Sequence, residues 1–269
     1  MDVSERATVA AESARAGGAV ALEQFRTVLD VEVKDGKTDV VTRADRLAQG
    51  AVVDRIRESF PDATIVGEEE EEGTASSVPD DGTAWVVDPI DGTNNFVRGN
   101  RRWATSVARL VDGRPVAAAN LLPAMGDAYV ATPDGVRVNG AAASVSDRTD
   151  PERFVVVPTV WWGFDRRDEY AAATRAIVQR FADLRRIGCA QAALSMLAAG
   201  RLDGVITNIQ VSPWDSIAGA AMVEWAGGTV TGIEGEEWRY DSRGLVASNG
   251  GAHDAVLAAA QEIEAAADG

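Results

Sequence analysis

The pattern of apolar and polar positions gives the N-terminal part of the chain two helices and two strands. Residues 4–29 are rich in alanine and place apolar side chains at helical spacing, which predicts a first helix. Between residues 48 and 60, apolar side chains recur every four residues and predict a second helix with one buried face. Pro61 ends this helix, and short apolar strands are predicted at 63–66 and 83–89.

The pattern changes after residue 102. Residues 102–138 contain short apolar runs that are broken by Asp-Gly, Pro, Met-Gly and Asn-Gly, which predicts a meander of antiparallel strands. Polar residues at 144–152 indicate a junction, and "RFVVVP" then opens a part in which strands and helices alternate. The strands expected there span 184–187, 204–206 and 245–248, and the helices span 166–182, 189–199, 214–226 and 253–267.

We therefore expect two halves. Residues 1–145 would form an α+β half with an antiparallel sheet. Residues 146–269 would form an α/β half. With 269 residues and 46% hydrophobic side chains, the chain can bury a large core.

Charge narrows the range of partners. The formal net charge is -16, which argues against nucleic acid and anionic membranes as partners, because phosphate groups need a basic surface. Lys34 and Lys37 are the only lysines among 26 basic residues. This acidic, arginine-rich composition resembles that of proteins from salt-accumulating archaea. The alternative explanation is a GC-rich genome, which also replaces lysine by arginine.

Single copies of cysteine and histidine exclude several kinds of site. Cys189 alone cannot form an internal disulfide or a cysteine-rich zinc site, and it suits a reducing compartment. Because His253 is the single histidine, a Ser-His-Asp or Cys-His catalytic site is not expected. No secretory signal is seen at the N-terminus, and no apolar run reaches the roughly 20 residues of a membrane span. We expect a cytoplasmic protein.

Two aspartates stand where a buried strand is predicted to end. The segment "WVVDPIDGTNNF", residues 85–96, runs five apolar residues up to and around Asp88 and Asp91, with Pro89 between them. A buried carboxylate without a partner is unfavourable unless a counter-charge or a metal ion accompanies it. The segment therefore predicts a positive charge close to these side chains.

Further acidic residues lie at other element ends. Glu68 follows a short strand, and Asp215 begins an alanine-rich helix. Mg²⁺ prefers carboxylate and carbonyl oxygens, and Glu68, Asp88, Asp91 and the Ile90 carbonyl would form such a set if the fold brings them together. The following residues, Gly92-Thr93, begin a helix whose free N–H groups would seat a phosphate.

Each of these residues also has an ordinary structural explanation. Glu68 belongs to the acidic run 68–72, which is typical of a solvated loop, and Asp91-Gly92 is a common turn. Asp215 is favoured at a helix N-terminus by the helix dipole, and Asp45 fits a capping partner of Thr42. Their occurrence in one chain, in one order, favours a shared metal site.

Four segments together resemble the inositol monophosphatase family. They are "DVVTRAD" (39–45), "GEE" (67–69), "WVVDPIDGTNNF" (85–96) and "WDSIAGAAMVEWAGG" (214–228). The family belongs to the lithium-sensitive, magnesium-dependent phosphatases, alongside fructose-1,6-bisphosphatases and bisphosphonucleotidases. The resemblance implies an α+β / α/β fold, a layered αβαβα sandwich, and homodimers. Inhibition by Li⁺ is a further implication.

The resemblance also implies roles for the two halves and for individual residues. Most metal ligands would lie in residues 1–145, and the residues for substrate specificity would lie in residues 146–269. It assigns a first Mg²⁺ to Glu68, Asp88 and the Ile90 carbonyl, a second to Asp88, Asp91 and Asp215, and a weaker third to Glu68. Thr93 and Asp45 would orient and deprotonate the attacking water, and the metal ligand Glu68 counts with them as catalytic. Substrate contacts are expected at Gly92, Thr93, Cys189, Ala190, Asn208 and Asp215, and Lys34 would contact the site from a loop. The implied reaction is in-line attack of water on phosphorus, with the second ion stabilising the leaving oxygen.

The substrate is less well determined by the resemblance. Animal inositol monophosphatases carry an acidic residue seven positions before the second-metal aspartate, where this chain has Asn208. This departure weakens the assignment to inositol, although an amide can still bind a polyol. "NNF" after "DPIDGT" favours inositol 1-phosphate or fructose 1,6-bisphosphate over a 3′(2′),5′-bisphosphate nucleotide. A catalytically inactive regulatory or RNA-associated binding member is the alternative of another class.

Five arginines and two tryptophans can each be interpreted as functional or as purely structural residues. A second phosphate could be met by Arg98, Arg101, Arg102, Arg185 and Arg186, which are otherwise surface residues. Trp161 and Trp162 are candidates for the dimer surface, and the alternative is a place in the core.

Overall fold

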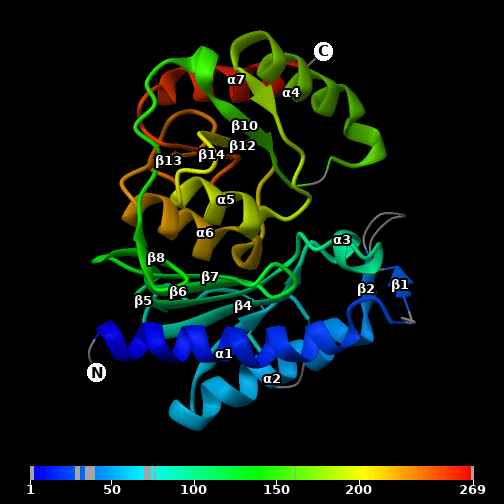
Figure 1. Ribbon diagram of the computed structural model, residues 1–269, viewed down its shortest axis with the longest axis vertical. Coiled ribbons are helices and arrows are strands. Elements are labelled where there is room, and N and C mark those ends of the chain that lie inside the picture. Colours follow the sequence, from blue (N-terminus) through cyan, green and yellow to red (C-terminus); the bar gives the residue numbers. More distant parts are fainter. Residues whose placement is uncertain are drawn as a thin grey trace.

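The computed structural model describes most of the chain. The described residues are 3–27, 31–33, 40–69, 74–75, 77–160 and 162–267, and Lys34 and Trp161 lie outside them. Within these residues the chain forms two large β-sheets, one two-stranded sheet and seven α-helices, and the large sheets and most helices stack in alternating layers (Figure 1). The predicted mixed α+β fold is confirmed.

The first sheet has seven strands and is covered on one face by helices α1 (Val3–Gln24) and α2 (Arg43–Ser59) (Figure 1). In spatial order its strands are β3 (Thr64–Gly67), β4 (Thr83–Asp91), β5 (Ala104–Val111), β6 (Arg114–Leu122), β7 (Asp127–Thr132), β8 (Gly135–Val138) and β9 (Ala141–Ala143). Strand β3 pairs with β4 in parallel, and all later neighbours are antiparallel. The antiparallel meander predicted after residue 102 is therefore present.

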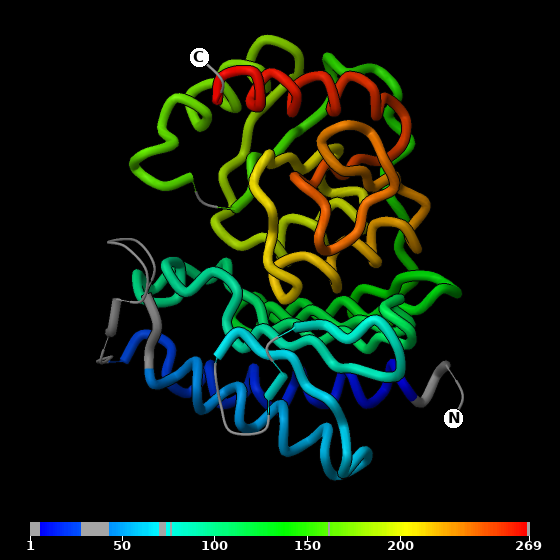
Figure 2. Tube along the Cα trace, turned by 180° about the vertical axis from the view of Figure 1, so that it is seen from behind, coloured from blue at the N-terminus to red at the C-terminus, as the bar shows by residue number. Residues whose placement is uncertain are grey.

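The second sheet has five strands in the order β11-β10-β12-β14-β13. They are β10 (Val155–Pro158), β11 (Asp183–Leu184), β12 (Gly204–Thr207), β13 (Thr229–Thr231) and β14 (Leu245–Ser248). Helices α5 (Ala190–Ala198) and α6 (Pro213–Trp225) lie between the two sheets, and α4 (Arg167–Arg180) and α7 (His253–Ala265) cover the outer face. Seen from behind, the C-terminal helix lies at the opposite end of the molecule from α1 and α2 (Figure 2).

Short elements complete the fold. They are the paired strands β1 (Val31–Val33) and β2 (Val40–Thr42), the short helix α3 (Thr93–Val97), and the 3-10 helices η1 (Pro151–Arg153) and η2 (Phe164–Arg166). No helix of the described residues is long and apolar enough to cross a membrane.

Some elements differ from those predicted. The first helix ends at Gln24, and the strand expected at 184–187 ends at Leu184. Beyond Leu184, Arg186 donates to the backbone carbonyls of Pro158 and Val160, and Gly188 turns the chain with a φ of 76° into α5. Strand β13 was not predicted, because three residues behind a glycine pair carry little periodicity.

Strand β4 is buried on both faces, and this determines the environment of the site. Trp85 and Val87 pack toward α1 and α2, whereas Val86 packs on the opposite face toward α5 and α6. Side chains alternate along a strand, so Asp88 continues the face of Val86. A carboxylate at this position is enclosed between the sheet and the central helices.

Candidate metal and phosphate site

Three carboxylates from two distant segments meet at the end of β4. Each of Asp88, Asp91 and Asp215 offers an oxygen, and these oxygens all lie within 4.8 Å of one another. The first two come from β4, and Asp215 comes from the first turn of α6. Aspartates separated by more than 120 positions in the chain are thus gathered into one cluster.

An irregularity in β4 lets its two aspartates face the same cluster. Residues three apart in a regular strand point to opposite faces of the sheet. Here the register against β5 shifts between Asp88 and Asp91, and such a bulge redirects the side chains that follow it. The hydroxyl of Thr105 donates to the Pro89 carbonyl at 2.8 Å and holds this irregular segment against β5.

Asp88 is the most unfavourably placed carboxylate of the cluster. It is 1% exposed, and neither of its oxygens accepts a hydrogen bond from the described residues. Burial raises the pKa of Asp88 well above its usual range, and the negative charges of Glu68, Asp91 and Asp215 raise it further. A divalent cation would supply both the missing ligand and the missing charge, so the donor set fits a hard metal ion such as Mg²⁺.

Asp91 is held by the beginning of α5. Its carboxylate accepts hydrogen bonds from the Cys189 thiol at 3.0 Å, from the Ala190 N–H at 3.2 Å and from the Gln191 N–H. Burial raises the pKa of Asp91, and these hydrogen bonds and the charge of Arg186 oppose that rise without cancelling it. The expected neighbours Cys189 and Ala190 therefore touch a predicted metal ligand, and whether they also touch substrate stays a prediction.

Glu68, in the loop after β3, lies near Asp88 and outside the three-aspartate cluster. Its charge acts on Asp88, and its N–H donates to the Val87 carbonyl at 3.2 Å. The next residue, Glu69, exchanges two hydrogen bonds with the buried side chain of Gln49, at 2.7 and 3.0 Å. These contacts order the start of the acidic run, so Glu68 is not part of an unattached loop.

Thr93 and Asp45 meet as the resemblance implied. The Thr93 hydroxyl lies 3.5 Å from a carboxylate oxygen of Asp45 and 3.1 Å from the Ile90 carbonyl. Asp45 is buried in the first turn of α2. The alternative role of Asp45, as a capping partner of Thr42, involves a side chain outside those that the structure describes.

Gly92 allows the two halves to approach closely. Its φ is 87°, and a Cβ atom built on it would lie 2.9 Å from the Gly188 carbonyl and 3.0 Å from the Cys189 Cβ. The side chain of Asn95 donates to the carbonyls of Ile187 and Gly188 at 2.9 and 3.1 Å. These contacts join α3 to the segment that leads into α5, and no residue with a side chain would fit at Gly92 without displacing them.

Asn208 lies in a buried polar network. Its side-chain oxygen accepts from the Trp162 indole at 2.8 Å, and its amide nitrogen donates to Glu169 at 2.5 Å and to Glu264 at 3.2 Å. Asn208 is 1% exposed, and its known partners belong to α4, α7 and the segment before them. None of these bonds joins Asn208 to the carboxylate cluster, and its contact with substrate stays a prediction.

Two of the remaining expected arginines have defined partners. Arg186 uses its guanidinium on two backbone carbonyls, and Arg185 pairs with Asp183. Arg98, Arg101 and Arg102 lie in or just after α3, and the structure does not test their contact with a second phosphate. Trp162 is 1% exposed, so the core explanation holds for this residue.

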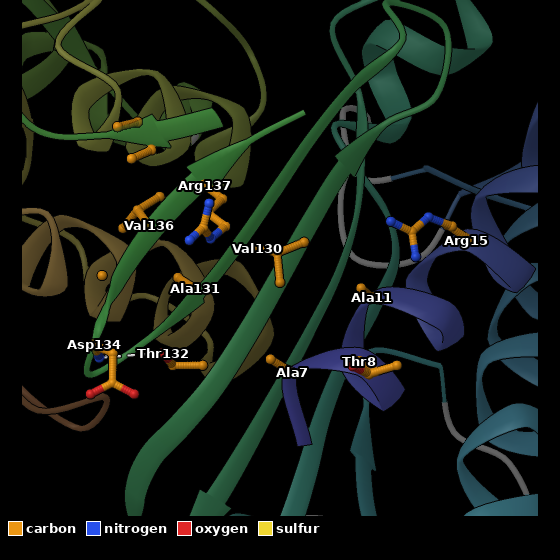
Figure 3. Close-up of a pocket in the computed structure, with 13 residues that line it drawn as sticks. Ala7, Thr8, Ala11, Arg15, Val130, Ala131, Thr132, Asp134, Val136 and Arg137 are labelled. Atoms are coloured by element: carbon orange, nitrogen blue, oxygen red, sulfur yellow. Dashed lines mark hydrogen bonds between the residues drawn. The ribbon is translucent and has the colours of Figure 1, made fainter. Parts of the chain in front are cut away.

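A separate hollow lies on the other side of the seven-stranded sheet. It has a volume of about 730 Å³ and lies between the N-terminal half of α1 and strands β7 to β9, with Ala7, Ala11 and Val130 on its walls (Figure 3). None of the predicted site residues lines it. Its single carboxylate, Asp134, offers no cluster of metal ligands such as the one at the end of β4.

A comparison with known protein families decides the relationship. The model of the Inositol monophosphatase family matches residues 2–265. The chain belongs to the inositol monophosphatase family.

Individual members of the family agree with this assignment. The chain is 34% identical over 259 residues to the Nus factor SuhB of Escherichia coli strain K12, covering 93% of each protein. It is 33% identical over 241 residues to the fructose-1,6-bisphosphatase/inositol-1-monophosphatase of Thermotoga maritima, covering 87% of each. A solved IMPase structure from Thermotoga maritima superimposes with a TM-score of 0.88 at 31% identity, covering 97% of this chain and 98% of that one. Membership of the inositol monophosphatase family supports phosphatase activity, and the acidic cluster makes metal binding plausible on chemical grounds.

Three residues of the site were not found from the sequence. Gln49 and Asn95 hydrogen-bond to backbone segments next to Glu68 and Gly92. Gln191 contacts Asp91 and also Trp214, the residue before Asp215. One signal was available for Gln191, because it is a polar residue near the start of the apolar, alanine-rich helix α5. Its partners lie far away in the sequence and could not be named in advance.

Proposed function

We propose that this chain is a Mg²⁺-dependent phosphomonoester hydrolase that acts on inositol 1-phosphate, fructose 1,6-bisphosphate or both. The observation that carries the proposal is the three-aspartate cluster, in which Asp88 and Asp91 are buried, Asp215 is half-buried, and neither Asp88 oxygen has a hydrogen-bond donor among the described residues. Such a cluster attracts a divalent cation and, through it, a phosphate ester. The name of the Thermotoga maritima relative supports this pair of substrates.

The chain would hold two or three Mg²⁺ ions. The ligands would be Glu68, Asp88 and the Ile90 carbonyl on one side and Asp88, Asp91 and Asp215 on the other, with Glu68 contributing to a weaker third position. When bound, Mg²⁺ supplies positive charge that acidifies a water molecule and stabilises the oxygen that leaves phosphorus.

The residues around the ions have separate tasks in this proposal. Thr93 lies between Ile90 and Asp45, where its hydroxyl can accept a proton from the attacking water while its own proton moves toward the Asp45 carboxylate. The N–H groups of Gly92 and Thr93 would hold the phosphate oxygens. The left-handed conformation of Gly92 supports this role, because it places the start of α3 next to the cluster.

A regulatory binding role is the second candidate. It is favoured by the Escherichia coli relative, which is named a Nus factor. This name is at odds with the expectation that the chain has no nucleic-acid partner. The net charge of -16 disfavours direct binding to a phosphate backbone. The complete carboxylate cluster favours catalysis, since a factor without activity has no need for a cation at Asp88.

Parallel turnover measurements test the proposed function. Phosphate release from inositol 1-phosphate, fructose 1,6-bisphosphate and adenosine 3′,5′-bisphosphate is measured with Mg²⁺ and with excess chelator. We expect release from one or both of the first two, only with Mg²⁺, and its loss in Asp91→Asn. Release that persists in chelator would refute the metal mechanism. Preference for the nucleotide would assign a bisphosphate nucleotidase, and no release from any substrate would favour the regulatory role.

We further propose a cytoplasmic homodimer that Li⁺ inhibits. The homodimer and the inhibition by Li⁺ come from the family resemblance, and the cytoplasmic location rests on the single cysteine and on the lack of a long apolar run. Light scattering on the purified chain tests the dimer, and a monomer at micromolar concentration would contradict it. Titration of Li⁺ into the turnover assay tests inhibition, with K⁺ at the same ionic strength as the control.

A further inference from the structure

Gln191 contacts both segments that supply the carboxylate cluster, the end of β4 and the first turn of α6. Its backbone N–H donates to Asp91, and its side-chain amide donates to the Trp214 carbonyl at 2.7 Å. Trp214 immediately precedes Asp215 in the first turn of α6. One residue, which is fully buried, therefore connects the Asp91 side of the cluster to the Asp215 side.

The orientation of the Gln191 amide is determined by a third contact. Asn120, on strand β6 of the seven-stranded sheet, donates from its amide nitrogen to the Gln191 side-chain oxygen at 2.8 Å. The opposite orientation would place two NH₂ groups against each other at Asn120 and two carbonyl oxygens against each other at Trp214. The contact with Asn120 thus directs the Gln191 donor toward α6.

Helix packing brings Gln191 close to α6. A Cβ atom built on Gly219 would lie 2.8 Å from the Gln191 side-chain oxygen and 2.5 Å from the Leu194 Cβ. The absence of a side chain at Gly219 lets α5 and α6 approach closely enough for Gln191 to reach the Trp214 carbonyl. Because that carbonyl belongs to the first turn of α6, the bond restricts the position of the turn that carries Asp215.

We infer that Gln191 is a positioning residue that holds Asp91 and Asp215 at the separation required to share one divalent cation. The inference rests on the proposed metal-dependent function. Carboxylates that ligate metals are oriented by such hydrogen bonds, and loss of the orienting group weakens metal binding about 10–100-fold in typical cases. An ordinary packing role for a buried glutamine would change stability and leave the metal affinity unaltered.

The test measures Mg²⁺ binding without relying on turnover. Metal-free full-length protein is titrated with Mg²⁺ by calorimetry for the wild type, Gln191→Met and Ser195→Ala. Methionine keeps the length of the side chain and removes the donor and the acceptor. Ser195→Ala is the matched control, because Ser195 lies on the same helix, is equally buried, and receives the other hydrogen bond of Asn120 at 2.9 Å.

We expect the Kd for Mg²⁺ to rise about 10–100-fold in Gln191→Met and to stay within about twofold of the wild type in Ser195→Ala. Turnover at saturating Mg²⁺ should fall much less than turnover at limiting Mg²⁺. Melting temperatures of the metal-free proteins report any general destabilisation. Unchanged Mg²⁺ affinity in Gln191→Met, or an equal loss in Ser195→Ala, would overturn the inference.

A second variant keeps the test decisive if Gln191→Met does not fold. Asn120→Leu leaves Gln191 in place and removes the group that orients its amide, so it should weaken Mg²⁺ binding in the same direction. A folded Asn120→Leu with wild-type affinity would then refute the positioning role. The two proposals can be told apart in the wild type: Mg²⁺ binding without phosphate release contradicts the proposed function alone, and no Mg²⁺ binding contradicts both.

Discussion

Replacement of Asp88 by asparagine should stabilise the metal-free protein. The Asp88 carboxyl is buried, has no hydrogen-bond donor among the described residues, and is repelled by Glu68, Asp91 and Asp215 when it is ionised. Its raised pKa means that the folded state binds this proton more tightly than the unfolded state. The unfavourable contribution is therefore absent below the unfolded pKa of about 3.9 and complete above the raised folded pKa.

The magnitude follows from the removed charge, because asparagine is neutral and its NH₂ group can donate to the neighbouring carboxylates. A buried polar group without partners is unfavourable by about 1–3 kcal/mol, and more when it is charged. For a chain of 269 residues, an unfolding entropy of about 2.1 cal/mol/K per residue gives roughly 0.56 kcal/mol per kelvin. The change of about 1–3 kcal/mol thus corresponds to a rise of about 2–5 °C in melting temperature for metal-free Asp88→Asn.

Scanning calorimetry in chelator at neutral pH, repeated with Mg²⁺, measures this effect. Mg²⁺ should raise the melting temperature of the wild type and have little effect on Asp88→Asn, because a ligand stabilises only the state that binds it. The matched control is Asp203→Asn. Asp203 is also 1% exposed, but it accepts from the Ser146 hydroxyl at 2.5 Å, from Arg148 at 3.1 Å and from the Val155 N–H at 2.9 Å.

Asp203→Asn should be destabilised by about 1–3 kcal/mol, since its new NH₂ group would face hydrogen-bond donors. The same substitution at equal burial thus has opposite effects at the two positions. If metal-free Asp88→Asn melts at or below the wild-type temperature, or if it falls as far as Asp203→Asn, the reasoning about an uncompensated carboxylate is refuted.

Three further predictions concern single residues. Thr93→Val should lower kcat about 10²–10⁴-fold while calorimetric Mg²⁺ affinity stays unchanged, because it removes only the hydroxyl beside Asp45; a parallel loss of Mg²⁺ binding would contradict this role. Gly92→Ala should lower the melting temperature, since a φ of 87° costs about 1–2 kcal/mol for a residue with Cβ, and an unchanged melting temperature would count against the close approach. Burial lowers the pKa of His253, so stability is retained above its unfolded pKa of about 6.5 and lost as pH falls from there toward the folded pKa. Urea unfolding between pH 7.5 and 5 should show a smaller pH dependence in His253→Gln, and an identical dependence would exclude His253 as its source.

The sequence by itself determined the candidate metal-ligating residue types and most element positions. Periodic apolar positions placed α2 and the antiparallel meander correctly, since side-chain burial repeats with the geometry of the helix and the strand. The incompatibility of Asp88 with a buried strand end indicated a cation, because an unpaired carboxylate is unfavourable there whatever the surrounding fold.

Only the tertiary structure decided which segments meet. The bulge between Asp88 and Asp91 and the positive φ of Gly92 direct β4 toward α5, and α6 brings Asp215 to the same point. Gln191 acts across this junction through partners on β6 and α6. Asn208 was predicted to contact substrate, and in the structure its side-chain amide bonds to Trp162, Glu169 and Glu264. Such contacts join residues far apart in sequence, and their partners follow from how the layers pack, which local periodicity does not encode.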